Sequence, residues 1–200
     1  GDPSYTNSSI QIYRLVDEDR RAWHAGISQW EQESSLNNRS IGIEVVNDFK
    51  CSELITHLNA APAIELECSF PVYPDSQIDS LVLLIKEILE RHPGIDPVDI
   101  VAHADIAPSR KSDPGPNFPW QKLYEAGIGA WYENDTVAGY LAEFERQLPS
   151  IHDAQCALSI YGYPITQSGA QDLQSQFAFR AFQLHYRASD YSGLIDTETL

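Results

Sequence analysis

The sequence contains few basic residues: 13 Lys and Arg stand against 29 Asp and Glu in 200 residues, a formal net charge of −16. A field of that sign repels nucleic-acid phosphates and anionic lipid surfaces, which argues against both as partners. No apolar run approaches the roughly 20 residues that a membrane helix needs. The chain also lacks internal repeats and low-complexity stretches. These absences favour a secreted globular protein with one domain, or one domain and a small module.

Cysteine is scarce, and the positions of Cys51, Cys68 and Cys156 exclude a common class of metal site. None of the three has the CxxC spacing of a thiolate metal centre. Cys51 and Cys68 bracket an irregular stretch from Asp48 to Tyr73, which a disulfide would close in an oxidising compartment. Two buried free thiols are the alternative. Cys156 falls in a helical apolar pattern and is expected in the core.

The run from Val101 to Gly115 concentrates the most chemistry in this chain. His103 ends an apolar, strand-like run, and Lys111 and Asp113 follow in a loop that Pro-Gly closes. Zinc accepts His nitrogen and Asp oxygen as ligands, and a catalytic site leaves one position open for water. The Lys111 ammonium would point toward a developing oxyanion. A plain polar loop after a strand is the alternative interpretation.

A second candidate, Glu44, lies in a segment that alternates between apolar and polar residues. The alternation from Ser40 to Asn47 predicts a strand, with Glu44 flanked by apolar neighbours. A carboxylate among apolar groups is costly unless it is paired or functional, and a pocket could raise its pKa toward neutrality. Such a carboxylate suits a general base. The alternative is a Glu on an edge strand that faces water.

The third candidate segment, from Arg21 to Ser28, places Trp23 and His24 among small residues. Gly26 allows a tight backbone path. The indole offers a flat apolar face and the imidazole a polar tip, as a groove for a sugar or a peptide requires. A buried Trp with a neighbouring His is the alternative.

Periodicity predicts an α/β fold, with a sheet whose strand ends present the chemistry. Strands are expected at 9–16, 40–46 and 98–103. A clear amphipathic helix should begin at Pro74–Ser76 and stop at His92–Gly94. Further helices are expected at 120–126, 137–146, 153–163 and 170–186, and a last element should begin at 193.

The motifs AWHAG, SIGIE and AHADIAPSRKSDPGPNFPW, in this order, resemble the zinc-dependent N-acetylmuramoyl-L-alanine amidases. This type-2 amidase family is related to the peptidoglycan recognition proteins, and the likeness is closest to its outer-membrane lipoprotein branch. The resemblance is strong from Ser9 to Trp131. It implies a mixed central sheet flanked by helices, and hydrolysis of the amide between the lactyl group of N-acetylmuramic acid and the first L-alanine.

The resemblance assigns roles to four residues of the catalytic chemistry. It implies that His103 and Asp113 bind Zn²⁺, that Glu44 is the general base for the zinc-activated water, and that Lys111 stabilises the tetrahedral oxyanion.

The same resemblance implies that Ala22, Trp23 and His24 line the groove for the muramyl sugar and the stem peptide. Peptidoglycan or its muropeptides would be the partner. A non-catalytic muropeptide-binding protein of the recognition type is the alternative function. The presence of both zinc ligands, the Glu and the Lys favours the enzyme.

The family's first zinc ligand is a His on an N-terminal strand that reads like IHYT, and no such segment precedes Gly1. We therefore expect the chain to lack the N-terminal part of the domain, together with any signal or lipid anchor. Alternatively, another group such as His24 replaces the missing ligand. The resemblance implies a periplasmic protein that is anchored to the outer membrane as a lipoprotein. We expect a monomer, although the sequence does not specify the oligomeric state.

Three parts of the chain are expected. Residues 1–131 would form the catalytic domain, 132–152 a linker with a short helix, and 153–200 a helical module. The pattern AFQLHYR with the following G.ID.ET resembles a three-helix peptidoglycan-binding module, here incomplete. A plain helical extension without a ligand is the alternative.

Overall fold

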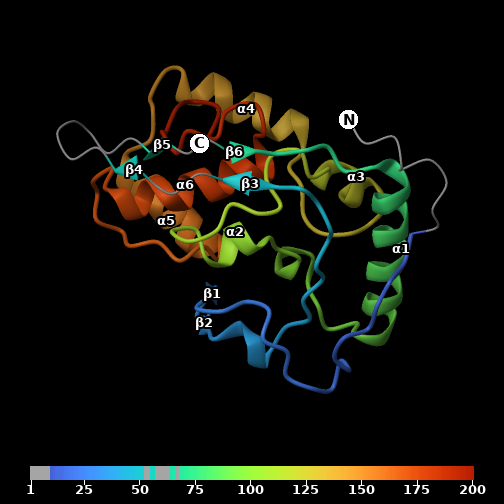
Figure 1. The fold of residues 1–200 in the computed structure, drawn as a ribbon. Coiled ribbons are helices and arrows are strands. Elements are labelled where there is room, and N and C mark those ends of the chain that lie inside the picture. The colour runs from blue at the N-terminus through green and yellow to red at the C-terminus, as the bar shows by residue number, and fades with distance from the viewer. Residues whose placement is uncertain (1–9, 52–54, 57–63, 66–67) are drawn as a thin grey trace.

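The computed structural model describes residues 10–51, 55–56, 64–65 and 68–200. Helices α1 and α3 lie on one side of the molecule, α5 and α6 on the other, and α2 lies below α6 (Figure 1). No described helix combines the length and the apolar character that crossing a membrane requires. The helices are α1 (Asp75–Arg91), α2 (His103–Ile106), α3 (Trp120–Glu125), α4 (Asn134–Phe144), α5 (Ile151–Tyr161) and α6 (Leu173–Tyr186).

Helix α1 confirms the strongest expectation from periodicity. Its apolar positions recur at helical spacing, so they form one buried stripe facing the core. The helix follows Pro74 and ends before His92, whose N–H still bonds the Ile88 carbonyl at 2.9 Å. The Lys122 ammonium of α3 reaches across to Asp79 at 2.8 Å, which joins the two helices. The buried stripe of α1 consists of Ile78, Leu81, Ile85 and Ile88.

The three expected strands do not form as hydrogen-bonded strands. Residues 10–16 and 40–46 have no ladder partner within the described part of the chain, and residue 9 lies outside it. Residues 97–99 form the 3-10 helix η3, and α2 then begins at His103. Period-two alternation selects which side chains face the core, but a strand also needs a second backbone within hydrogen-bond reach.

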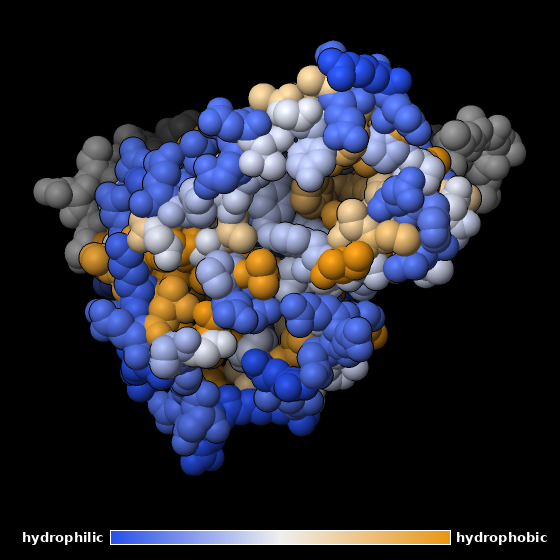
Figure 2. Space-filling view, turned by 180° about the vertical axis from the view of Figure 1, so that it is seen from behind, coloured by the Kyte–Doolittle hydropathy of each residue, from blue (hydrophilic) through white to orange (hydrophobic). Residues whose placement is uncertain are grey.

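The unpaired segments keep apolar side chains in water. Leu15 and Val46 are both 84% exposed, whereas Val45 packs against the core. Figure 2 shows hydrophobic surface gathered on the side of the molecule where α1 lies, at the left of that view. Residues 10–16 are all exposed, and Gly42, Ile43 and Glu44 are exposed in succession, so the alternation in sequence does not select a buried face here.

The described strands are three short antiparallel pairs. Strand β1 (Gln29–Trp30) pairs with β2 (Glu33–Ser34). In the Asp48–Tyr73 stretch, expected to be irregular, β3 (Lys50–Cys51) pairs with β6 (Cys68–Ser69), and β4 (Ile55–Thr56) pairs with β5 (Ile64–Glu65).

The ladder between β3 and β6 also bears on the cysteines. Cys51 lies directly opposite Cys68 in the ladder. Cys68 is disulfide-bonded, so the alternative of a free thiol at this position is wrong. Cys156 is a free thiol, and it is half-buried on α5 rather than fully in the core.

The expected C-terminal helices are confirmed with shifted ends. Helix α4 corresponds to 137–146 and none of its residues is buried. Helix α5 ends at Gly162, where a Cβ would lie 2.7 Å from Trp30 Cε2. Helix α6 begins at Asp172, whose carboxylate accepts the Ser175 N–H at 2.8 Å.

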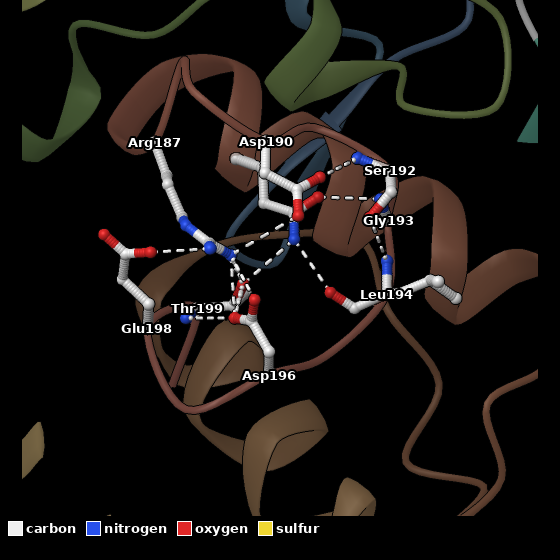
Figure 3. A network of polar contacts seen from close by, with 9 residues as sticks. Arg187, Asp190, Ser192, Gly193, Leu194, Asp196, Glu198 and Thr199 are labelled. Carbon is white, nitrogen blue, oxygen red and sulfur yellow. Dashed lines mark hydrogen bonds and ion pairs between the residues drawn. The ribbon is translucent and has the colours of Figure 1, made fainter.

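A polar network centred on Arg187 closes the end of the chain against α6 (Figure 3). The guanidinium donates to Asp196 at 2.7 Å and pairs with Glu198 at 2.6 Å. Thr199 is buried and accepts both from Arg187 and from Gln183 of α6. Where an element is expected to begin at residue 193, the described residues form a turn after Asp196, whose carboxylate accepts the Thr199 N–H at 2.9 Å.

One hydrophobic cluster includes Trp30, Ile78 and Leu123 together with Leu158 and Phe179. Its members come from both sides of the expected linker at 132–152. The proposed division at residues 131 and 153 remains a prediction, and the described C-terminal helices share their core with the rest of the chain.

Candidate functional site

Helix α2 places the two expected metal ligands together. His103 is its first residue, and the Ala104 N–H donates to the main-chain carbonyl of Asp113 at 3.0 Å. That bond folds the loop back, so that His103 Nδ1 and Asp113 Oδ2 lie 3.1 Å apart. Ten residues of sequence separation therefore become a direct side-chain contact.

The two ring nitrogens of His103 each lie near an oxygen atom, Nδ1 near Asp113 and Nε2 near Ala25. His103 Nε2 lies 3.3 Å from the carbonyl oxygen of Ala25, which can only accept a hydrogen bond. Both ring nitrogens of His103 therefore face oxygen atoms, and a proton, or a metal ion in its place, can be held between Nδ1 and the Asp113 carboxylate. Backbone-held imidazoles of this kind are typical metal ligands.

The donor pair fits zinc. Bonds of about 2.0–2.2 Å in a tetrahedron place two ligand atoms about 3.3–3.5 Å apart, close to the observed separation of Nδ1 and Oδ2. Within the described residues, no group of three His, Cys, Asp or Glu side chains could hold a metal. His24 therefore does not complete the pair in this structure. Its Nε2 lies 3.2 Å from the Ser40 carbonyl oxygen.

The charges around Asp113 favour its ionised form. Burial acts to raise the pKa of the Asp113 carboxyl, but the His103 hydrogen bond and the positive charges of His103 and Lys111 outweigh it and lower the pKa. Lys111 is half-buried, and its ammonium has no hydrogen-bonded or ion-pair partner among the described residues. The lysine thus presents an uncommitted positive charge beside the pair.

A buried tyrosine backs the same loop. The Tyr73 hydroxyl donates to the Pro114 carbonyl oxygen at 3.1 Å. Burial, together with the Asp113 charge, raises the pKa of Tyr73 to about 12. Tyr73 therefore stays neutral and supports the backbone next to Asp113.

The segment with Trp23 and His24 is bonded to this loop. Arg110 donates to the carbonyl of Ala25 at 2.9 Å and to that of Ile27 at 3.0 Å. The Trp23 side chain is 79% exposed and carries the Arg21 guanidinium 4.1 Å from the ring centroid. An indole that faces water beside a polar pair fits a groove wall, and the alternative of a buried Trp is wrong. Ala22 is half-buried next to it.

Glu44 lies on the segment that packs against His24. The His24 ring occupies the space that a Cβ on Gly42 would need, two residues before Glu44. The Glu44 side chain is exposed, and it makes no hydrogen bond or ion pair in the described part of the chain. The structure thus brings the segment of Glu44 to the Trp23–His24 loop and leaves the carboxylate open to solvent.

Sequence reasoning missed several residues that build the site. Asn37 is buried, and its side-chain oxygen accepts the N–H groups of His24 and Ala25 at 2.9 and 2.7 Å. Arg110 and Tyr73 hold carbonyls, as described above. A polar side chain that bonds backbone gives no periodic or motif signal, so only the fold reveals these roles.

An imidazole–carboxylate pair with an ammonium beside it is the kind of arrangement expected in a hydrolase that activates water. The chain matches the family model Amidase_2, N-acetylmuramoyl-L-alanine amidase, over residues 5–116. It belongs to this family, and it is an N-acetylmuramoyl-L-alanine amidase, a hydrolase.

Relatives of known name agree with this assignment. The chain is 39% identical over 201 residues to N-acetylmuramoyl-L-alanine amidase AmiD of Escherichia coli, covering 98% of this chain and 67% of AmiD. It is 33% identical to 1,6-anhydro-N-acetylmuramyl-L-alanine amidase AmpD of Enterobacter cloacae, over 57% of this chain and 50% of AmpD.

Solved structures show that the fold is shared. The crystal structure of AmpDh3 from Pseudomonas aeruginosa superposes with a TM-score of 0.82 at 43% identity, covering 94% of this chain and 69% of AmpDh3. The E. coli AmiD complex with anhydro-N-acetylmuramic acid-L-Ala-D-gamma-Glu-L-Lys gives a TM-score of 0.78 at 37% identity, covering 98% and 72%. The chain thus shares the fold of the AmpDh3 and AmiD structures, and its described part is mostly helical with three short strand pairs.

Proposed function

We propose that this amidase cleaves the amide between N-acetylmuramic acid and L-alanine in muropeptides, with zinc held by His103 and Asp113. The observation that carries the proposal is the His103–Asp113 pair, whose imidazole is oriented by the Ala25 carbonyl. A zinc ion bound there would polarise the amide carbonyl and lower the pKa of water in the site. The substrates named for the AmiD and AmpDh3 complexes support muropeptides as the substrate class.

The other residues of the site take roles that follow from their chemistry. Glu44 would accept the proton of the attacking water and pass it to the leaving amine. Lys111 would face the oxyanion that forms on the carbonyl oxygen. Ala22, Trp23 and His24 would position the muramyl sugar and the stem peptide along the exposed indole.

The proposed setting is the periplasm, with a lipid anchor in the outer membrane and the enzyme acting as a monomer. The disulfide at Cys68 suits an oxidising compartment. A net charge of −16 gives no attraction to nucleic acid.

The test measures zinc content together with hydrolysis of a muramyl-peptide by the full-length protein. Glu44→Gln should keep zinc and substrate binding and lose about 10²–10⁴-fold in turnover, since it removes the general base. EDTA should abolish wild-type cleavage, and added zinc should restore it. Full activity after chelation would refute the metal role, and near-normal kcat in Glu44→Gln would refute the role of the base.

The non-catalytic alternative makes a different prediction in the same experiment. A muropeptide-binding protein would hold the muramyl-peptide with zinc bound and release no peptide. The free positive charge of Lys111 beside the pair favours the enzyme, because ligand binding alone does not require it.

A further inference from the structure

A fully buried carboxylate lies two residues after His103. Asp105 is 0% exposed, and both of its oxygens are used. The Tyr163 hydroxyl donates to one at 2.8 Å, and His185 Nδ1 lies 2.8 Å from the other. Tyr163 directly follows α5 and His185 belongs to α6, so the C-terminal helices supply both side-chain partners.

The same carboxylate determines where α2 begins. Asp105 accepts the Ala102 N–H at 2.7 Å, which caps the helix at the residue before His103. From α2, the Ala104 N–H holds the Asp113 main chain at 3.0 Å. A displacement of Asp105 would therefore move both members of the His103–Asp113 pair.

We infer that Tyr163 and His185 are residues that position the His103–Asp113 pair, and that the C-terminal helices are a structural part of the active site. They act through Asp105 and α2, and they do not touch the ligands themselves. The inference rests on the proposed metal-dependent function. It adds that a peptidoglycan-binding role of these helices, if present, is not their only one.

The surroundings of His185 leave its imidazole little freedom. Its ring stacks on Trp120 of α3, with centroids 3.8 Å apart, and on Tyr186, with centroids 4.2 Å apart. The ring nitrogen is thus fixed toward Asp105. A ligand-orienting shell of this kind typically contributes about 10–100-fold to metal affinity when its members touch the ligand, so an indirect shell should lie near the lower limit.

The chain offers a matched pair of variants for the test. Tyr163→Phe removes the hydroxyl that Asp105 accepts. Tyr161→Phe removes a hydroxyl from the same aromatic cluster, one that pairs with Tyr186 at 2.6 Å and not with Asp105. Zinc affinity is measured by competition with a chelating dye on the full-length protein, with melting temperatures recorded for each variant.

Tyr163→Phe should weaken zinc binding about 10-fold, whereas Tyr161→Phe should bind as the wild type. His185→Leu should weaken zinc binding at least as much, and His185→Asn should partly restore it because its amide can still donate to Asp105. Zinc affinity equal to that of the wild type in all four variants would overturn the inference. Equal weakening of zinc binding in Tyr161→Phe and Tyr163→Phe would overturn it as well.

A second readout separates this inference from the proposed function. In metal-free protein, hydrogen exchange at the Ala104 amide of α2 and at the Ala107 amide that follows it should be faster in Tyr163→Phe than in Tyr161→Phe. Wild-type protein that binds no zinc would refute the metal function, and the exchange rates would still decide the positioning role. Identical exchange in the two variants would overturn it.

Discussion

At the scale of single residues, the candidate site combines side chains that have hydrogen-bond partners with one ammonium that has no ion-pair partner in the described part of the chain. His103, Asp113 and Arg110 each have defined partners within 3.3 Å. The Lys111 ammonium has none in the described part of the chain. An unpaired ammonium next to the His103–Asp113 pair can stabilise the negative charge that would form on the carbonyl oxygen during the reaction.

Lys111→Ala should therefore lower kcat by about 10²–10³-fold and leave KM nearly unchanged, as for the loss of one oxyanion donor. Steady-state hydrolysis of a muramyl-peptide measures both constants. Lys122→Ala is the matched control, since that lysine pairs with Asp75 and Asp79 of α1 and its loss should leave both constants unaffected. A rise in KM alone for Lys111→Ala would place this lysine in the groove wall instead.

At the scale of elements, the C-terminal end of helix α1 binds the N-terminal region of the chain through one acidic residue, Glu18. Glu18 accepts from Arg91 at 2.6 Å, and its other oxygen lies 2.8 Å from His92 Nε2, both at the C-terminal end of α1. Hydrogen bonds from Arg91 and then His92 lower the pKa of Glu18 from 4.5 to about 2. Glu18 is thus paired by charge with the C-terminal end of α1.

The pH dependence of this contact follows from the lowered pKa. The folded state holds Glu18 ionised more strongly than the unfolded chain does, so its contribution is present above pH 4.5 and is lost as the pH falls toward 2. Glu18→Gln should melt at a lower temperature than the wild type above pH 4.5, and the difference should vanish toward pH 2. Glu143→Gln, on the exposed face of α4, serves as the control. A difference that stays constant with pH would contradict the pairing.

At the scale of the whole molecule, the N-terminal half and the C-terminal helices share one core. Trp30 of β1 packs edge-to-face on Tyr161 and Tyr163, with centroids 6.1 and 5.0 Å away. The Glu31 N–H donates to the Gly162 carbonyl oxygen at 2.7 Å. Burial of Trp30 against α5 therefore couples residues more than a hundred positions apart.

Trp30→Ala should cost about 3–5 kcal/mol of unfolding free energy, because a large side chain leaves a cavity between the two halves. Urea unfolding followed by far-ultraviolet circular dichroism would show one transition at a lower midpoint. Trp23→Ala, at an exposed indole, should change stability by less than about 0.5 kcal/mol. Two separate transitions in the wild type would support an independent module at 153–200 and contradict the shared core.

The sequence by itself determined the helices that have a strong apolar periodicity. It also determined the candidate site residues that lie close together in one motif. Helix α1 follows from its apolar stripe, and the residues His103, Lys111 and Asp113 follow from one loop. The family assignment follows from the same motifs. These features are readable because neighbouring residues carry them.

Only the tertiary structure decided what depends on distant partners. Alternation predicts a strand at 40–46 and an apolar run predicts one at 98–103, yet pairing needs a second backbone that neither pattern specifies. The direction of His103 depends on the Ala25 carbonyl, and the start of α2 depends on Asp105 with partners from α5 and α6. Long-range contacts of this kind leave no periodic trace in the chain, so they became visible only when the segments were folded against one another.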